Sequence, residues 1–540
     1  MKELVPGIPR ERLAAFAAIT LVFLAMLWPE RAYVPIWDGR VYADCVIDAA
    51  RSGLSFESLR CARHPTQAWA AVLAIPQLLH PGDVRILHLT DALLGILALA
   101  CIRVALRRVF PEPALARQLD LVTLACAVHP VVLSTLVQVN IDFGVYVFFF
   151  AALAALLAER FLWTAVAGLL LCFAKETGVL AYAVMIGLDA AFRAAGTAGT
   201  WSARVRSGLR SWVTMLPLVV FAVHVRLWDA THPVPAVWKH GWQKQTMDGF
   251  KFFDLSDPVF ASYAAGIFVL GFLWAVSAII ASDLAVGGVR MARRLPVRPV
   301  PGADRARLAY LTVLTVVLTY LLTSFRTWSN LRYFALLYPL LVILAFAALL
   351  RLDASPRVRT GALAAIVALF VFAAFRSADP VSRGVYGTFS IGEREMYRMA
   401  SITGEYAGPG RDELVYNLEF TGYDAAQNAL FRQLRPTAST VIATGRAALW
   451  NIFSPLDAVT FRRTLRSVNV VTPRYRDDEG LRAAATTARP HELWFLEFSY
   501  RPDADTSLRS LAGNYRETAV MRATAGGHVV VAHRFEMRTP

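Results

Sequence analysis

The chain lacks the short motifs that mark many hydrolytic and nucleotide-dependent enzymes. Its 540 residues contain no G-x-S-x-G elbow, no P-loop and no dinucleotide-binding glycine pattern. No H-x-x-x-H pair of the zinc-binding kind occurs, and there is no internal repeat or low-complexity segment. The sequence therefore offers little support for a hydrolase or a nucleotide-dependent enzyme.

Charge is scarce as well. Charged residues make up 18% of the chain and hydrophobic residues 56%, and the mean hydropathy is +0.46. Apolar runs near the ~20 residues that cross a hydrocarbon core recur along the first two-thirds. No small-residue cleavage site follows the first run, so we expect an anchor and not a signal peptide. We predict an all-α membrane bundle of about eleven transmembrane helices, at 13–29, 85–106, 118–138, 142–158, 161–174, 177–193, 211–228, 259–281, 308–325, 332–350 and 360–376.

The net charge of +15 is distributed unevenly. After Arg376, 20 Lys and Arg residues stand against 18 Asp and Glu residues, so nearly all the excess lies in the membrane part. There the basic residues concentrate in alternate loops, as the positive-inside rule expects for a cytoplasmic N-terminus in a bacterial inner membrane. The charge therefore indicates topology and argues against a nucleic-acid partner. The loops predicted to be cytoplasmic are 103–117, 159–160, 193–210, 283–307 and 351–359.

This orientation divides the chain into two predicted domains. Residues 1–376 form a transmembrane domain with a large periplasmic first loop at 30–84, and residues 377–540 form a periplasmic α/β domain. Helical patterns are predicted at 392–403 and 424–436. The β-like runs lie at 413–420, 439–445, 467–473, 491–498 and 526–535.

Ionisable residues from separate segments share the predicted outer face. Because ionisable groups near a bilayer are costly to keep there, a functional site is the default hypothesis. The ionisable residues concerned are Asp38, Asp44, Asp48, Asp142, Lys175, Glu176, Arg326 and Arg332, and the neutral Asn140 stands two positions before Asp142.

Ordinary structural roles stay open for each of them. A carboxylate at a helix start is often only a cap, which applies to Asp38 and Asp142. A cation at the end of a span often extends to the membrane interface, which applies to Lys175 and Arg332. The tryptophans of the loop 229–258 are typical of an interfacial aromatic belt. All of these residues are predicted to lie at the same membrane face, and this shared position favours a functional site over separate structural roles.

The ordered motifs resemble the GT-C superfamily of polyprenyl-phosphate-sugar glycosyltransferases, which includes protein O-mannosyltransferases and lipid A aminoarabinose transferases. The family's early acidic motif is matched by "WDGRVY", and its His-Pro element by "RHPTQAWAAVLAIPQLL". The segments "HPVVLSTLVQVNIDFG", "AKETG" and "LRYFALLYPLLVIL" then follow in the family's order. Two positions depart from the pattern: Asp-Glu is here Asp38-Gly39, and His-Pro-Pro is here His64-Pro65-Thr66.

The resemblance implies an enzyme that moves a hexosyl or pentosyl group from a polyprenyl-phosphate donor to a periplasmic glycan, lipid or protein, with inversion. It implies that Asp38 is the base that deprotonates the acceptor and that Asp142 is a second carboxylate of the site. The departing phosphate needs cations, for which Lys175, Arg332 and Arg326 are the candidates. The candidates for binding the acceptor or lipid are His64, Trp238, Lys239 and Trp242.

Other functions and a cofactor stay open. The alternative is a transporter or flippase of a lipid-linked sugar, although transporters usually place ionisable residues near the bilayer midplane. A polytopic scaffold with an inactive site is a third hypothesis. The sequence names no cofactor with certainty, and His64, His232 and His240 with the carboxylates leave a divalent metal open.

Two of the five cysteines, Cys45 and Cys61, fall in the predicted periplasmic loop, sixteen positions apart. An oxidising compartment allows them to pair. In the chain-entropy model, closing a loop of that size contributes ~3 kcal/mol. We predict a disulfide that holds the Asp38 segment beneath His64. The other three cysteines fall in spans and are expected to be packed thiols.

Overall fold

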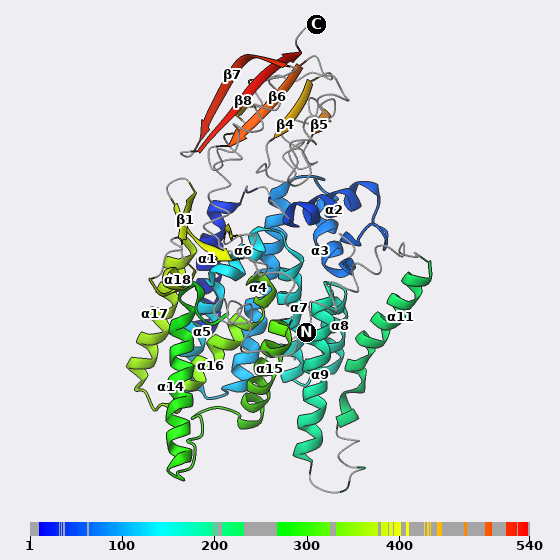
Figure 1. Cartoon of the computed structure of the whole chain (residues 1–540). Helices are drawn as coiled ribbons and strands as arrows, with labels where there is room; N and C mark the ends of the chain where they lie inside the picture. Colours follow the sequence, from blue (N-terminus) through cyan, green and yellow to red (C-terminus); the bar gives the residue numbers. More distant parts are fainter. Residues whose placement is uncertain are drawn as a thin grey trace.

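The computed structural model shows a bundle of helices with a β-sheet at one end (Figure 1). Two shorter helices, α2 and α3, lie at that same end of the bundle. The structure describes residues 10–31, 33, 35, 38–61, 64–197, 200, 202, 208–231, 267–324, 331–375, 380–386, 388–391, 394–400, 407–409, 426, 429–430, 433, 440–444, 469–471, 492–498, 515–525 and 528–537.

The bundle is built from α-helices of very different lengths. Its α-helices are α1 (Arg10–Leu27), α4 (Val84–Val109), α5 (Ala116–Ala127), α6 (Pro130–Val137), α7 (Ile141–Leu157), α8 (Phe161–Cys172), α9 (Glu176–Gly196), α11 (Leu216–Thr231), α14 (Leu273–Ala292), α15 (Arg305–Ser324), α16 (Leu337–Arg351), α17 (Pro356–Phe375) and the short α18 (Pro380–Tyr386). The 3-10 turns are η1 (Trp28–Glu30), η3 (Pro113–Leu115), η4 (Leu209–Met215), η5 (Leu270–Phe272) and η6 (Leu331–Phe334).

Seven of the described helices are long and apolar enough to cross a membrane. The predicted spans match these seven, the bent pair α5–α6 and the shorter apolar helices α7, α8 and α16. The span predicted at 259–281 is displaced, because α14 starts only at Leu273, and residues 259–266 lie outside the described part of the chain. The count of eleven spans stays a prediction.

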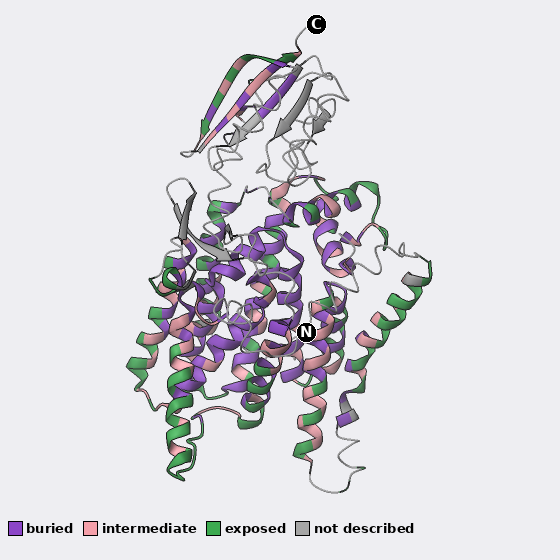
Figure 2. Cartoon of the chain, viewed as in Figure 1, coloured by how far each residue is buried: buried purple, intermediate pink, exposed green. Residues whose placement is uncertain are grey.

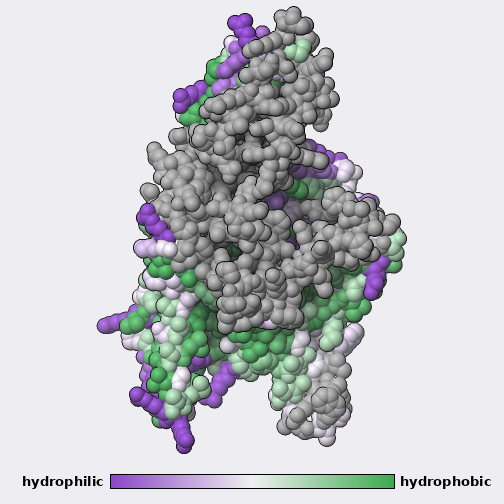
Figure 3. Space-filling model, in the orientation of Figure 1, coloured by the Kyte–Doolittle hydropathy of each residue, from purple (hydrophilic) through white to green (hydrophobic). Residues whose placement is uncertain are grey.

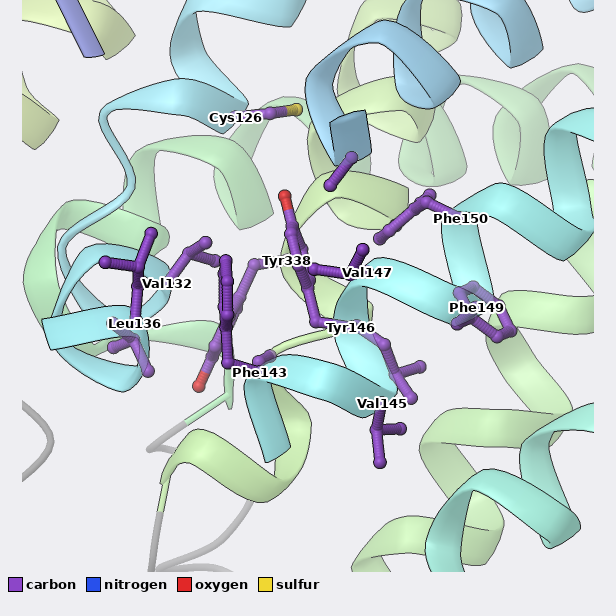
Figure 4. Packing of buried hydrophobic residues seen from close by; sticks show 14 of the residues in the cluster. Cys126, Val132, Leu136, Phe143, Val145, Tyr146, Val147, Phe149, Phe150 and Tyr338 are labelled. Atoms are coloured by element: carbon purple, nitrogen blue, oxygen red, sulfur yellow. The ribbon is translucent and has the colours of Figure 1, made fainter. Parts of the chain in front are cut away.

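The hydrophobic core lies between the helices of the bundle (Figure 2). Helix α7 is hydrophobic and buried on nearly all sides, as expected for a helix inside a bundle. Along α7, Phe143, Tyr146, Phe149 and Phe150 are buried among other apolar side chains (Figure 4). On the visible outer face of the helices, hydrophobic side chains predominate over much of the body (Figure 3). A lipid environment suits that surface.

A strained turn joins α6 to α7 and fixes the start of α7. Val139 has a φ of +52°, a left-handed conformation that costs a β-branched residue about 1–2 kcal/mol. Asn140 follows it and caps α7, since its side-chain oxygen accepts a hydrogen bond from the Asp142 backbone N–H at 3.1 Å. The turn therefore places Asp142 in the first turn of a buried helix.

The loop between α1 and α4 carries α2 (Asp38–Ser52) and α3 (Gln67–Gln77). Cys45 of α2 and Cys61 form a disulfide with their Cα atoms 5.7 Å apart, the pairing that the sequence suggested. Tyr42 packs edge-to-face against Trp69 of α3, with ring centroids 6.0 Å apart. The disulfide and this ring contact hold the two helices together.

The C-terminal part contains two sheets. The larger has five strands in the order β5-β4-β6-β8-β7, parallel from β5 to β6 and antiparallel from β6 to β7. The smaller has three antiparallel strands in the order β1-β2-β3. The strands are β1 (Thr388–Ile391), β2 (Arg394–Ala400), β3 (Ala407–Pro409), β4 (Thr440–Thr444), β5 (Asn469–Val471), β6 (Glu492–Phe498), β7 (Tyr515–Ala525) and β8 (His528–Met537).

Most predicted β runs correspond to strands, but one predicted helix is wrong. Four runs contain β4, β5, β6 and β8, whereas the run at 413–420 lies outside the described residues. The helix predicted at 392–403 is instead the strand β2, which pairs with β1 on one side and β3 on the other. Pairing on both edges outweighs the helical propensity of this segment. The strands β1, β3 and β7 were not predicted.

Candidate functional site

Four charged side chains from distant segments meet at the end of the bundle beside α2. Asp38 is the first residue of α2, and Asp142 lies in the first turn of α7. Lys175 immediately precedes α9, and Arg332 lies in η6. The sequence placed these four on one face, and the structure brings them into direct contact.

The four charges alternate in sign along a row of ion pairs. Arg332 pairs through Nη2 with Asp38, and its Nε lies 3.5 Å from Oδ2 of Asp142. The other carboxylate oxygen of Asp142 accepts a hydrogen bond from Nζ of Lys175 at 2.7 Å. Arg332, Asp142 and Lys175 are buried, whereas the Asp38 side chain is half exposed. Because every buried charge has an opposite neighbour, the cluster can persist without bulk water around it.

The aromatic ring of Tyr333 lies near both Lys175 and Arg332. Nζ of Lys175 lies 4.2 Å from the centroid of the Tyr333 ring, and the guanidinium carbon of Arg332 lies 5.6 Å from it. The negative face of an aromatic ring attracts cations at these distances. Sequence reasoning missed Tyr333, although its position directly after Arg332 was a usable signal.

Tyr42 is a second residue that sequence reasoning missed. It lies one helical turn after Asp38, so the two side chains share a face of α2. Burial raises the pKa of the Tyr42 phenol, and the nearby carboxylates of Asp38 and Asp142 raise it further. The phenol therefore stays protonated and is a hydrogen-bond donor beside the two carboxylates.

Gly39 allows α2 to approach the turn between α6 and α7. A Cβ atom at this position would lie 1.8 Å from the backbone oxygen of Gln138 and 2.9 Å from its carbonyl carbon. The contact is with backbone, which cannot turn aside as a flexible side chain can. This close approach gives a steric reason for Gly39 where the resembling family commonly has Glu.

We expect Gly39→Ala to displace α2 and to separate Asp38 from Arg332. Overpacking of this kind typically costs about 1–3 kcal/mol, so the melting temperature in detergent is expected to fall. The transfer activity that the family resemblance implies is expected to fall at least ~10-fold, because small misplacements of a reacting group are costly. Gly187→Ala is the matched control, since nothing lies within 4 Å of a Cβ added there. Equal behaviour of the two variants would contradict the packing role of Gly39.

His64 connects the first loop to α9 at the edge of the cluster. Its Nδ1 lies 2.9 Å from Oε2 of Glu176, the residue that follows Lys175. Its ring centroid lies 6.4 Å from that of Tyr42. His64 is therefore positioned beside the cluster, as predicted for an acceptor- or lipid-binding residue, and its role stays a prediction.

The remaining candidates lie elsewhere. Asp44 points along α2 to Arg40, with a separation of 3.5 Å between their charged atoms, and this pair has an evident structural role. Within the described ranges, no group of three or more His, Cys, Asp or Glu side chains is arranged to hold a metal ion. The candidates that fall outside the described residues are Arg326, His232, Trp238, Lys239, His240 and Trp242.

Known structures resemble the chain along nearly its whole length. The structure of ArnT from Cupriavidus metallidurans is 16% identical, with a TM-score of 0.54 over 96% of this chain and 97% of that one. The chain has the GT-C fold. The arabinofuranosyltransferase AftD from Mycobacteria is 15% identical, with a TM-score of 0.51 over 99% of this chain and 40% of AftD. No protein-family model and no curated protein matches the sequence significantly.

The fold agrees with the family resemblance that the ordered sequence motifs indicated. ArnT and AftD are both GT-C glycosyltransferases. At this level of sequence identity the likeness establishes the fold, and the chemistry must be argued from the charged cluster itself.

Proposed function

We propose that the chain is an integral-membrane glycosyltransferase that moves a sugar from a polyprenyl-phosphate donor to an acceptor hydroxyl. The observation that carries the proposal is the buried pair of cations, Lys175 and Arg332, beside the half-exposed carboxylate of Asp38. The GT-C fold supports the same class of reaction. The identity of the sugar and of the acceptor is left open by the cluster.

The two cations suit the leaving group of this reaction. A sugar on a lipid phosphate already has a good leaving group, so charge stabilisation matters more than protonation. Arg332 offers a planar set of donors that matches phosphate oxygens, and Lys175 offers a compact charge. Their burial strengthens the attraction to phosphate, because little water screens it.

The carboxylates suit the other half of the reaction. Asp38 takes the proton from the acceptor hydroxyl while the acceptor oxygen forms a bond to the anomeric carbon. The bond from that carbon to the phosphate oxygen breaks, and its electron pair leaves with the polyprenyl phosphate. A single displacement of this kind inverts the anomeric centre. Asp142 orients Lys175 and Arg332 through its two ion pairs.

We propose further that the cluster faces the periplasm. Helices α9 and α14, which carry Arg193 and Arg290 in their last turns, both end at the end of the bundle opposite α2 and α3 (Figure 1). The positive-inside rule assigns that end to the cytoplasm. Residues 377–540 then form a periplasmic domain, and lipid-linked sugars are the donors that such a site can use.

A transporter of the lipid-linked sugar is less well supported. The ionised cluster joins the ends of α2, α7, α9 and η6, where substrates meet from the lipid and from water. Transporters usually bind their substrates near the bilayer midplane, between repeats of the same fold.

Deletion of the gene, followed by intact-mass analysis of envelope glycolipids, glycans and proteins, tests the proposal. We expect one class of envelope molecule to lose the mass of a single hexose or pentose. A plasmid with the wild-type gene restores that mass, and the Asp38→Asn gene does not. Unchanged masses in all three classes contradict the proposed function.

A further inference from the structure

We propose that Arg332 is exchanged between Asp38 and the donor phosphate, so that binding of the donor releases the base. The inference rests on the proposed function and deepens it, because it assigns an order to the two substrates. The ion pair between Arg332 and Asp38 is the starting observation. The same guanidinium that holds the proposed base is the one best suited to hold the phosphate.

The charges of the cluster make such an exchange necessary. Two carboxylates and two cations give a sum of zero, and a phosphodiester adds at least one negative charge. Arg332 already has one nitrogen on Asp38 and another 3.5 Å from Asp142. A phosphate that binds this guanidinium in the forked geometry therefore competes with one of the two carboxylates.

Burial decides which carboxylate leaves. The Asp142 side chain is only 5% exposed, and it keeps its hydrogen bond from Lys175 at 2.7 Å. The Asp38 side chain is 51% exposed, so water can solvate it as soon as it separates from Arg332. A buried carboxylate separated from its partners is left where water cannot solvate it, whereas the exposed side of Asp38 is already in reach of water. Asp38 is therefore the carboxylate that separates from Arg332 when the phosphate binds.

The movement is confined to the Asp38 side chain. The backbone of α2 is held one residue later, where Gly39 packs against the backbone of Gln138. It is held again by the disulfide of Cys45. Rotation of the carboxylate about its side-chain bonds separates it from Arg332 without any shift of the helix.

The exchange links acceptor activation to donor binding. A carboxylate that accepts from a guanidinium is less available to accept a hydrogen bond from a hydroxyl group. Asp38 is released from Arg332 only when a phosphate occupies that guanidinium, so the donor binds first and the acceptor is deprotonated second. After transfer Asp38 carries the acceptor's proton. When it loses that proton it competes again for Arg332, which favours departure of the polyprenyl phosphate.

A double-mutant cycle on lipid binding tests the exchange directly. The dissociation constant of an undecaprenyl phosphate probe is measured for the whole chain in nanodiscs, with undecaprenol as the probe that lacks the phosphate. Asp38→Asn is expected to bind the phosphate probe roughly tenfold more tightly than wild type, because Arg332 no longer has a competing carboxylate. Undecaprenol binding is expected to stay unchanged.

The comparison variants separate exchange from a general field effect. Asp44→Asn removes the same charge from the same helix and is expected to leave the affinity within about twofold. In an Arg332→Gln background, Asp38→Asn is expected to change the affinity by less than about twofold. Equal tightening in both backgrounds, or no tightening by Asp38→Asn, overturns the proposal.

The outcome does not depend on sugar transfer, so it is distinguishable from failure of the proposed function. If the effect of Asp38→Asn on lipid binding depends on Arg332 but the protein transfers no sugar, the exchange is supported and the transferase function is contradicted. If the protein transfers sugar but Asp38→Asn binds the probe as wild type does, the transferase function is supported and the exchange is contradicted. The comparison of wild type, Asp38→Asn and Asp44→Asn changes no residue in the buried part of the cluster, so it stands even if Arg332→Gln does not fold.

Discussion

Replacing Asp38 with Asn is expected to lower sugar transfer at least ~100-fold while binding of the lipid donor is retained or tightened. Asn has nearly the same size and is an equally good residue at a helix start. It lacks the basic oxygen that takes the acceptor's proton. The measurement is the initial rate of transfer by purified protein in proteoliposomes, at saturating donor.

Asp44→Asn is the matched control for that experiment. Asp44 lies on the same helix and pairs with Arg40, with 3.5 Å between their charged atoms. Its rate is expected to stay within about threefold of wild type, as for a pair with a structural role. If folded Asp38→Asn protein transfers sugar at a near wild-type rate, Asp38 is only a helix cap, and the base must be sought at Asp142.

Replacing Lys175 with Ala is expected to impair both stability and donor binding. The change removes the closer cationic partner of the buried Asp142 carboxylate and leaves Arg332 at 3.5 Å. Removing one member of a buried ion pair typically costs about 3–5 kcal/mol, so a clear fall in melting temperature is expected. Affinity for undecaprenyl phosphate is expected to fall at least ~10-fold, since one of the two cations proposed to bind the phosphate is lost.

A neutral double variant separates these two effects. Lys175→Gln combined with Asp142→Asn removes both charges and keeps a hydrogen-bonded pair of similar volume. The melting temperature is expected to return most of the way to that of wild type, because no buried charge is left unpaired. Donor binding and transfer are expected to stay low. Recovery of transfer together with stability would show that Lys175 has a structural role alone.

The sequence predicted the residues of the cluster better than it predicted their contacts. Asp38, Asp142, Lys175 and Arg332 stand next to apolar runs, where ionisable residues are rare enough to be conspicuous. Topology then placed them at one end of the bundle. The ion pairs between them depend on the packing of α2, α7, α9 and η6, which no local pattern specifies.

Aromatic residues and glycine were harder to assign. Tyr42 and Tyr333 look like ordinary interfacial tyrosines in the sequence, and only their rings' positions beside the charges give them a role. Gly39 looked like a departure from the family's acidic motif, whereas its contact with Gln138 shows why a side chain is excluded. The strand β2 was mistaken for a helix because its residues suit either state until strands pair on both sides.

The central claim is that the cluster transfers a sugar from a lipid phosphate. In the most direct experiment, the purified protein is incubated in liposomes with lipid-linked sugars extracted from the membranes of the cells that produce it. An extract of envelope glycans, lipids and proteins from the same cells supplies the acceptors. Mass spectrometry then quantifies the polyprenyl phosphate released and the acceptor mass gained. We expect the released polyprenyl phosphate and the acceptor mass to rise together with wild-type protein, and we expect neither quantity to rise with Asp38→Asn. Sugar transfer by the cluster would be contradicted if the two proteins released equal amounts of polyprenyl phosphate and gave equal gains in acceptor mass. It would also be contradicted if wild-type protein gave neither.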